Sequence, residues 1–251
     1  MLASFVLLAA AAATAHAHTV MQQIIVDGKA QGALTGIRVP AKNSPITDVT
    51  SDDIICNANL KTAADVIDVQ GGSKVGIEWH RTIGKLSSDV ISESHHGPLQ
   101  VYLAKVNSAT QEDVTGLSWF KIAEQGFDAG SNAWATDDLI KNKGVFDFTM
   151  PSCIEAGDYI MRADITALHN ARPNKANGAQ LYIGCSQFKV SGTDGSATPS
   201  TVSFPGAYDP DDEGLHVNPF QKVTSYPIPG PQTFSCDGVS ALIPMQASEF
   251  D

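Results

Sequence analysis

His18 is the first residue in this sequence whose position points to chemistry, because it follows a potential cleavage site for a signal peptidase. Residues 2–13 form an apolar run, and Ala15 and Ala17 supply the small-x-small pattern that precedes such a cut. Cleavage after Ala17 would give His18 a free α-amino group beside its imidazole, and these two nitrogens can chelate one metal ion. Imidazole ligands favour copper, zinc, nickel or iron. The alternative is a cut that exposes His18 by accident.

Other histidines are candidates for the rest of such a site. After His18 come His80, His95, His96, His169 and His216. His95 and His96 are adjacent, so a strand-like backbone would point their side chains in opposite directions. At most one of the two can then share a site with His18. The residues alone do not choose between them.

A predicted strand over residues 180–185 would present two further polar side chains together. Because side chains alternate along a strand, Gln180 and Tyr182 share one face, whereas Cys185 belongs to the other, core-like face. An amide and a phenol would then lie side by side. The pattern by itself favours a plainer interpretation, in which this face is an ordinary solvent-exposed strand surface.

The elements that would carry these side chains are short strands separated by turns. We predict strands within 20–40, on both sides of a turn at Asp27-Gly28, and over 74–79, 99–106, 145–150, 157–165 and 179–190. A short helix capped by Thr136 is predicted over 136–141, and loops over 41–57, 80–94, 171–178 and 206–230. Alternation is weak between 112 and 144, although Trp79, Trp119 and Trp134 are expected in the core. Many short strands without a long apolar helix predict an all-β sandwich.

Composition limits the class of protein. The formal net charge is −11 and the pI about 4.9, which argues against nucleic acid or an anionic membrane as a partner. An apolar content of 43% allows a sizeable core. Four cysteines, an even number in a secreted chain, predict two disulfides, and none of them forms a C-x-x-C pair typical of a zinc site.

We expect three segments along the chain. Residues 1–17 would be a secretion signal peptide that is removed, since its apolar run is too short to span a membrane. Residues 18–236 would form the catalytic domain. Residues 237–251 would be a short C-terminal tail without a carbohydrate-binding module.

Several motifs together resemble those of fungal lytic polysaccharide monooxygenases of auxiliary activity family 9, formerly classed as glycoside hydrolase family 61. Besides His18, these are Ser94-His95-His96-Gly97-Pro98, Ala167-Leu168-His169, Gln180-x-Tyr182-x-x-Cys185, Trp119-Phe120-Lys121-Ile122 and Ser225-Tyr226-x-Ile228-Pro229-Gly230-Pro231. The resemblance covers residues 18–236. Each motif alone is weak, whereas the combination is specific.

The resemblance implies a centre holding one copper ion per chain. The amine and imidazole of His18 would supply two nitrogens, and His95 the third. His96 then falls at a variable position and would not be a ligand. Tyr182 would lie axial to the copper, with its hydroxyl close to the metal or weakly bound.

The resemblance also assigns roles around the metal. His169 and Gln180 would be catalytic residues that orient the oxygen species through hydrogen bonds, together with Tyr182. Tyr226 matches the family's surface tyrosine and would bind substrate, and Phe220 and His216 could widen the same face. The implied disulfides are Cys56 with Cys185 and Cys153 with Cys236.

The implied fold is an immunoglobulin- or fibronectin-III-like β-sandwich whose long loops form a flat substrate face. The implied protein is a secreted, monomeric oxidoreductase that cleaves cellulose or a related β-1,4-glucan surface. It would hydroxylate C1 and/or C4 with O2 or H2O2 and an external electron donor. One alternative is a glycosidase, which needs two carboxylates about 5–10 Å apart, and no such pair stands out. Another is a non-catalytic secreted copper- or polysaccharide-binding β-sandwich protein.

Overall fold

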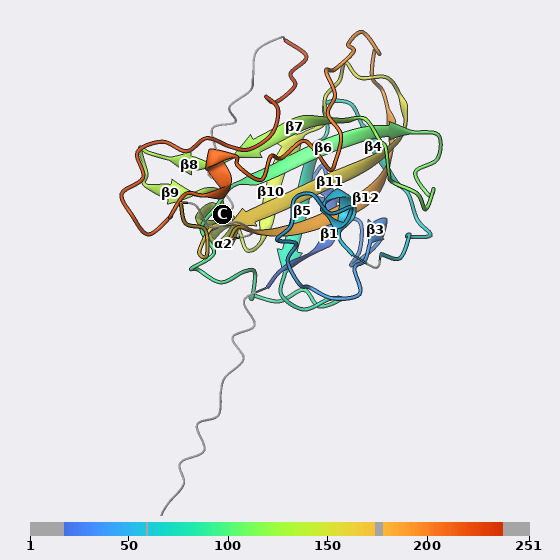
Figure 1. The fold of residues 1–251 in the computed structure, drawn as a ribbon. Helices are drawn as coiled ribbons and strands as arrows, with labels where there is room; N and C mark the ends of the chain where they lie inside the picture. The colour runs from blue at the N-terminus through green and yellow to red at the C-terminus, as the bar shows by residue number, and fades with distance from the viewer. Residues whose placement is uncertain (1–17, 59, 174–177, 238–251) are drawn as a thin grey trace, which may run out of the picture.

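A four-stranded and a six-stranded sheet face each other in the computed structural model, which describes residues 18–58, 60–173 and 178–237 (Figure 1). The predicted signal segment 1–17 and nearly all of the predicted tail 237–251 lie outside the described residues. The smaller sheet has the order β10-β5-β1-β2, with β1 Val20–Val26, β2 Lys29–Ala30, β5 Lys74–His80 and β10 Val145–Thr149.

The larger sheet has the order β3-β12-β11-β6-β7, and β4 pairs in parallel with β12. Its strands are β3 Ile37–Arg38, β4 Ile67–Gln70, β6 Leu99–Val106, β7 Trp119–Gln125, β11 Gly157–Ala167 and β12 Gln180–Ser191. Shorter elements are α1 Asp53–Cys56, β8 Phe127–Asp128, β9 Ala133–Trp134, α2 Ala135–Lys141 and the 3₁₀ helix η1 Glu213–Leu215.

The core lies between the inner faces of the two sheets. Val75, Ile77 and Trp79 alternate along β5 and are fully buried, and Val101 and Leu103 do the same along β6. Period-two alternation therefore places apolar side chains on one face of each strand, and the two faces pack together. The predicted all-β, immunoglobulin-like sandwich is confirmed.

The outer face of the larger sheet is also buried, so both faces of β12 are covered, and this agrees with the core-like face predicted for Cys185. Leu181 and Ile183 pack there with Ile54 of α1 and Phe204 of the C-terminal loop, in a second apolar cluster. Tyr182 points the other way, into the inner cluster, and is only 1% exposed. The plainer interpretation of its face as a solvent surface is therefore wrong, because the opposite sheet covers it.

Two further predictions need correction. Residues 119–125, where weak alternation predicted no strand, form β7, in which Lys121 and Glu124 interrupt the apolar alternation but pair with each other at 2.7 Å. The helix near 136–141 exists, but Trp134 is its cap residue, and Asp137 Oδ2 accepts the Trp134 backbone N–H at 2.8 Å. Thr136 lies inside the first turn.

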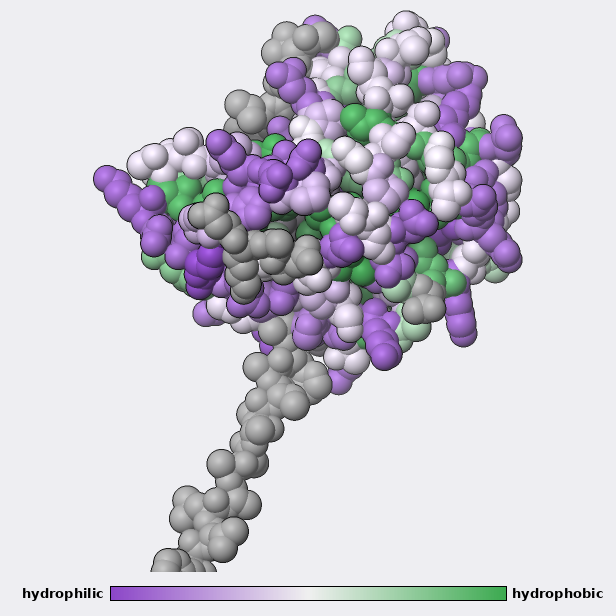
Figure 2. Space-filling view, in the orientation of Figure 1, coloured by the Kyte–Doolittle hydropathy of each residue, from purple (hydrophilic) through white to green (hydrophobic). Residues whose placement is uncertain are grey.

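Cys56 is paired with Cys185, and Cys153 with Cys236, as the resemblance implies. The first disulfide ties α1 to the middle of β12, and the second ties the loop after β10 to the end of the described chain. Polar residues cover most of the face shown in Figure 2, with apolar residues in small separate patches. Within the described ranges, we find no helix with the length and apolar character needed to cross a membrane.

Candidate metal centre

Four chain segments bring histidine and tyrosine side chains to one end of the sandwich. His18 directly precedes β1 of the smaller sheet, and His95 lies in the loop that leads into β6 of the larger sheet. His169 follows the end of β11, where Ala167 pairs with Gln180 at the start of β12. This end of the sandwich also holds α2, β8 and β9 (Figure 1).

The rings of these residues contact one another. The ring centroids of His18 and His95 each lie 5.9 Å from that of Tyr182. His95 and His169 are stacked, with centroids 3.9 Å apart and planes inclined by 21°. The Tyr182 hydroxyl donates to Gln180 Oε1 at 2.9 Å. The structure thus brings together His18, His95, His169, Gln180 and Tyr182.

Burial keeps two side chains of this cluster, those of His95 and Tyr182, in their neutral forms. His95 is 4% exposed, and burial, followed by the nearby His169 and His18, lowers its pKa to about 3. Its imidazole therefore keeps a nitrogen lone pair at physiological pH, as a metal ligand must. Burial also raises the pKa of Tyr182, so its phenol keeps the proton that it donates to Gln180.

The backbone after His95 is held by a clamp that the sequence analysis missed. The Gly97 N–H donates to Thr136 Oγ1 at 3.2 Å, and the Thr136 N–H donates back to the Gly97 carbonyl at 3.3 Å. A Cβ atom at Gly97 would stand 1.8 Å from the Thr166 carbonyl oxygen, so only glycine fits against β11. The glycine in the Ser-His-x-Gly-Pro motif was the available signal for this close approach.

His96 turns away from the cluster. Its Nδ1 lies 3.1 Å from Asp137 Oδ1 on α2, and its ring meets Phe220 edge to face at 5.8 Å. This divergence agrees with the argument that only one of the two adjacent histidines can share a site with His18, and it favours His95.

The donor set fits copper. In the described part of the chain, no group of three or more His, Cys, Asp and Glu side chains is arranged to hold a metal. The cluster offers two imidazoles, from His18 and His95, beside the phenol of Tyr182. A third nitrogen would come from the α-amine of His18 after cleavage. Nitrogen donors with a weak oxygen donor suit copper among the first-row metals.

Tyr226 lies in the C-terminal loop and packs against the protein. Its hydroxyl donates to the Gly214 carbonyl at 2.8 Å, and its ring meets Trp134 edge to face at 4.9 Å. The side chain is half-buried, and burial raises its pKa. These contacts fix the loop, and a substrate contact by Tyr226 stays a prediction.

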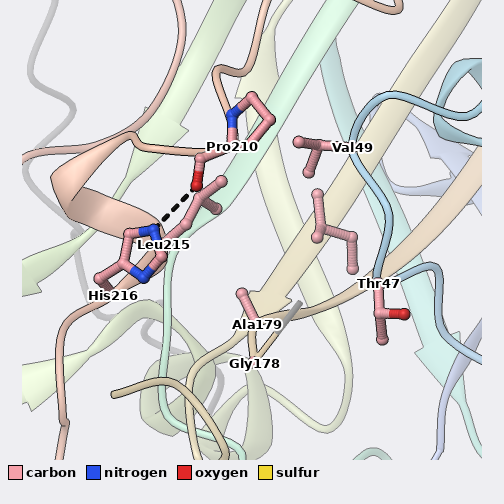
Figure 3. A pocket seen from close by; sticks show the side chains of 8 residues that line it. Thr47, Val49, Gly178, Ala179, Pro210, Leu215 and His216 are labelled. Atoms are coloured by element: carbon pink, nitrogen blue, oxygen red, sulfur yellow. Dashed lines mark hydrogen bonds between the residues drawn. The ribbon is translucent and has the colours of Figure 1, made fainter. Parts of the chain in front are cut away.

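His216, suggested as part of the substrate face, borders a small cavity (Figure 3). Its Nε2–H donates to the Pro210 carbonyl at 2.8 Å, so the ring is tied to its own loop. The cavity also touches Ala179, which precedes Gln180. Its volume of about 20 Å³ suits a single water molecule, not a sugar ring.

Comparison with known proteins identifies the family to which the chain belongs. The family model of Auxiliary Activity family 9, formerly glycoside hydrolase family 61, matches residues 18–226. This chain belongs to auxiliary activity family 9. The match begins at His18, and it includes the other four residues of the candidate centre, which are His95, His169, Gln180 and Tyr182.

Individual relatives support the family assignment. The chain is 48% identical over 243 residues to AA9 family lytic polysaccharide monooxygenase C of Neurospora crassa, covering 92% of this chain. It is 44% identical over 225 residues to monooxygenase D of Malbranchea cinnamomea, covering 88% of this chain and 93% of that protein. Among solved structures, CvAA9A superposes with a TM-score of 0.78 at 34% identity, covering 86% of this chain and 98% of that one.

The chain spans 66% of the length of the Neurospora relative and 57% of that of a relative from Aspergillus niger. What those longer proteins do as a whole therefore remains a proposal for this family member.

Proposed function

We propose that this chain is a copper-dependent lytic polysaccharide monooxygenase, secreted and processed so that His18 becomes its first residue. It would cleave cellulose or a related β-1,4-glucan at C1 and/or C4, with O2 or H2O2 and an external electron donor. The observation that carries the proposal is the convergence of His18, His95 and Tyr182 at one end of the sandwich. Family membership and the match beginning at His18 support it.

Each residue of the cluster has a separate task. His18 and His95 would hold the copper through nitrogen, and bound copper would supply one-electron chemistry with the oxygen cosubstrate. Stacking of His169 on His95 restricts rotation of the ligand ring. The Tyr182 hydroxyl donates to Gln180 Oε1, so the oxygen of the Gln180 amide is turned toward Tyr182. The N–H groups of that amide therefore face away from Tyr182 and can donate to another group. We assign those donors, with His169, to positioning the oxygen cosubstrate.

A net charge of −11 suits a neutral polysaccharide better than an anionic partner. We assign residues 18–236 to the catalytic domain and 237–251 to a tail, and we propose that the protein acts as an extracellular monomer. Tyr226 is proposed to contact the glucan, with its packing on Trp134 holding the ring in place.

The decisive experiment incubates the mature protein with cellulose and copper, with and without ascorbate. We expect oxidised oligosaccharides only when the reductant is present. Sugars released equally without reductant would indicate a hydrolase instead. Binding of copper and cellulose without any product would indicate the non-catalytic binding protein, which has no need of Gln180 and His169 beside Tyr182.

A matched form tests the role of the N-terminus. One extra residue before His18 turns its amine into an amide and leaves the fold unchanged. We expect this form to lose tight copper binding and oxidative activity, and full activity would contradict the proposed centre.

A further inference from the structure

Thr136 is a buried polar residue whose hydroxyl serves a segment far from it in the sequence. It is 1% exposed and lies in the first turn of α2. Its Oγ1 accepts the Gly97 N–H at 3.2 Å, and its own N–H donates to the Gly97 carbonyl at 3.3 Å. Two hydrogen bonds therefore join α2 to the chain directly beyond His95 and His96.

The helix that carries Thr136 is anchored independently of His95. Ala135 and Leu139 of α2 are buried in the inner core cluster. The Ala135 N–H also donates to the carbonyl of Gly126, which directly follows β7, at 2.9 Å. The Thr136 hydroxyl is therefore presented from a fixed base.

The segment after His95 is also held by β11. The Leu168 N–H donates to the His96 carbonyl at 2.8 Å, and the Thr166 N–H donates to the Pro98 carbonyl at 3.1 Å. The carbonyls on either side of Gly97 thus bond to the end of β11, whereas both backbone groups of Gly97 bond to α2. Alternate residues of an extended segment direct their backbone groups to opposite edges, so α2 and β11 hold this segment from two sides.

A second contact joins α2 to the same segment, and it is weaker. Asp137 Oδ1 lies 3.1 Å from His96 Nδ1, with side chains 27% and 26% exposed. Water reaches both groups, and partly exposed pairs of this kind contribute little. The buried hydroxyl of Thr136 is therefore the main contact from α2 that holds the segment.

We propose that Thr136 is a positioning residue for the metal centre, which acts through Gly97 and His95 without touching the metal. His18 precedes a strand of the smaller sheet, and His95 precedes a strand of the larger sheet. The distance between these two residues therefore depends on how the loop before β6 is held. Fixing Gly97 would fix the direction in which His95 presents its ring to His18. The proposal rests on the function proposed for the metal centre, with both histidines as copper ligands.

Three variants separate the Thr136 hydroxyl from the rest of the side chain. Thr136→Ser keeps the hydroxyl, Thr136→Ala removes it, and Thr136→Val replaces it with a methyl group of similar size. Thr166→Val is the matched control, because it removes another buried hydroxyl, which donates to Asp164 Oδ1 at 3.3 Å and does not contact Gly97.

The copper-loaded mature protein gives two readouts besides activity, which are affinity by calorimetry and the EPR spectrum of Cu(II) in frozen solution. We expect Thr136→Ala and Thr136→Val to weaken copper binding about 10-fold, since groups that orient metal ligands affect affinity by about 10- to 100-fold. Both should also change the parallel copper hyperfine coupling, which depends on the arrangement of the ligands. Thr136→Ser should restore both readouts. Thr166→Val should lower the thermal midpoint and leave both readouts unchanged.

Amide exchange at Gly97, measured by NMR in the copper-free protein, tests the hydrogen bond itself. We expect exchange to quicken at least about 10-fold in Thr136→Ala, because the N–H loses its acceptor, and to stay slow in Thr136→Ser. If Thr136→Val does not fold, the serine and alanine variants make the same comparison. Wild-type affinity and spectrum in Thr136→Ala, or an equal change in Thr166→Val, would overturn the positioning role.

The outcome can be separated from that of the proposed function. If the wild type makes oxidised products while Thr136→Ala keeps the wild-type affinity and spectrum, the positioning role is wrong and the function stands. If the wild type binds copper through His95 but makes no product, and Thr136→Ala still changes affinity and spectrum, the function is wrong and the positioning role stands.

Discussion

The molecule has two polar clusters, one buried along β11 of the larger sheet and one at the end of the sandwich. The interior cluster lies along the middle of β11, where Arg162 and Asp164 are both fully buried and form a short ion pair. The Tyr208 hydroxyl donates to Asp164 Oδ2 at 2.8 Å and lies 3.0 Å from the Tyr102 hydroxyl. The Arg162 guanidinium also lies 4.0 Å from the centre of the Phe204 ring.

The candidate metal centre differs from the interior cluster in where its residues come from and in the groups that they present. Its members come from four segments of both sheets, and they meet mainly through ring contacts. Its donors are imidazoles and a phenol, whereas the interior cluster combines a guanidinium with a carboxylate. The interior cluster therefore satisfies its own charges and stabilises the fold. The metal centre presents lone pairs that suit an added cation.

Removing one charge from the interior cluster should have the largest effect. Asp164→Ala would leave Arg162 buried and unpaired, so we expect the free energy of unfolding to fall by about 3–5 kcal/mol. Urea denaturation of the copper-free protein measures this loss. Copper affinity of the folded variant, determined by calorimetry, should stay within about threefold of the wild type. A loss of stability below about 1 kcal/mol would show that the cluster is not the stabilising element.

Removing a proposed copper ligand should lower copper affinity far more than it lowers stability. We expect His95→Ala to weaken copper binding by more than about 100-fold, beyond the effect typical of residues that only surround a metal. Its loss of stability without copper should be smaller than that of Asp164→Ala, because the substitution removes a ring stacked on His169 and leaves no unpaired charge buried. His96→Ala is the matched control, and its copper affinity should equal that of the wild type. Equal losses at both positions would contradict the assignment of His95.

Replacing a residue beside the proposed ligands should have a smaller effect than replacing a ligand. Replacing Gln180 with Ala removes the amide next to Tyr182, and we expect the yield of oxidised product to fall about 10- to 100-fold. Lys189→Ala, at an exposed position on the same strand, serves as the control and should retain full yield. An unchanged yield for the Gln180 variant would remove the amide from the proposed chemistry.

The two clusters also differ in how far the sequence predicted them. Alternation at Val75, Ile77 and Trp79 correctly predicted a strand and its buried face, because that face is uniformly apolar. The same rule cannot identify Arg162 and Asp164 as buried residues, since polar side chains on one face of a strand normally indicate solvent. Loops that carry Phe204 and Tyr208 cover that face, and the alternation within β11 contains no information about them.

The candidate metal centre was predicted through a resemblance, and the geometry of its side chains needed the structure. Pairing of Ala167 with Gln180 brings His169 to the start of β12, which no local pattern could reveal. Threonine is common at helix caps, so the pattern predicts Thr136 as the cap, whereas its hydroxyl accepts from Gly97 across two segments. Long-range contacts of this kind decide which of several candidate side chains meet.

The smallest effect should come from an ion pair at the surface, and it tests whether charge or burial explains the interior cluster. Lys74 and Asp147 lie 3.0 Å apart, with side chains 63% and 40% exposed. Asp147→Ala repeats the substitution made at Asp164, but water can solvate the remaining Lys74. We expect a loss of only about 0–1 kcal/mol. Salt should screen this small effect, whereas the loss at Asp164 should persist in high salt because the interior pair is shielded from ions. Similar losses at both positions would mean that the carboxylate itself, and not its burial beside Arg162, accounts for the stability.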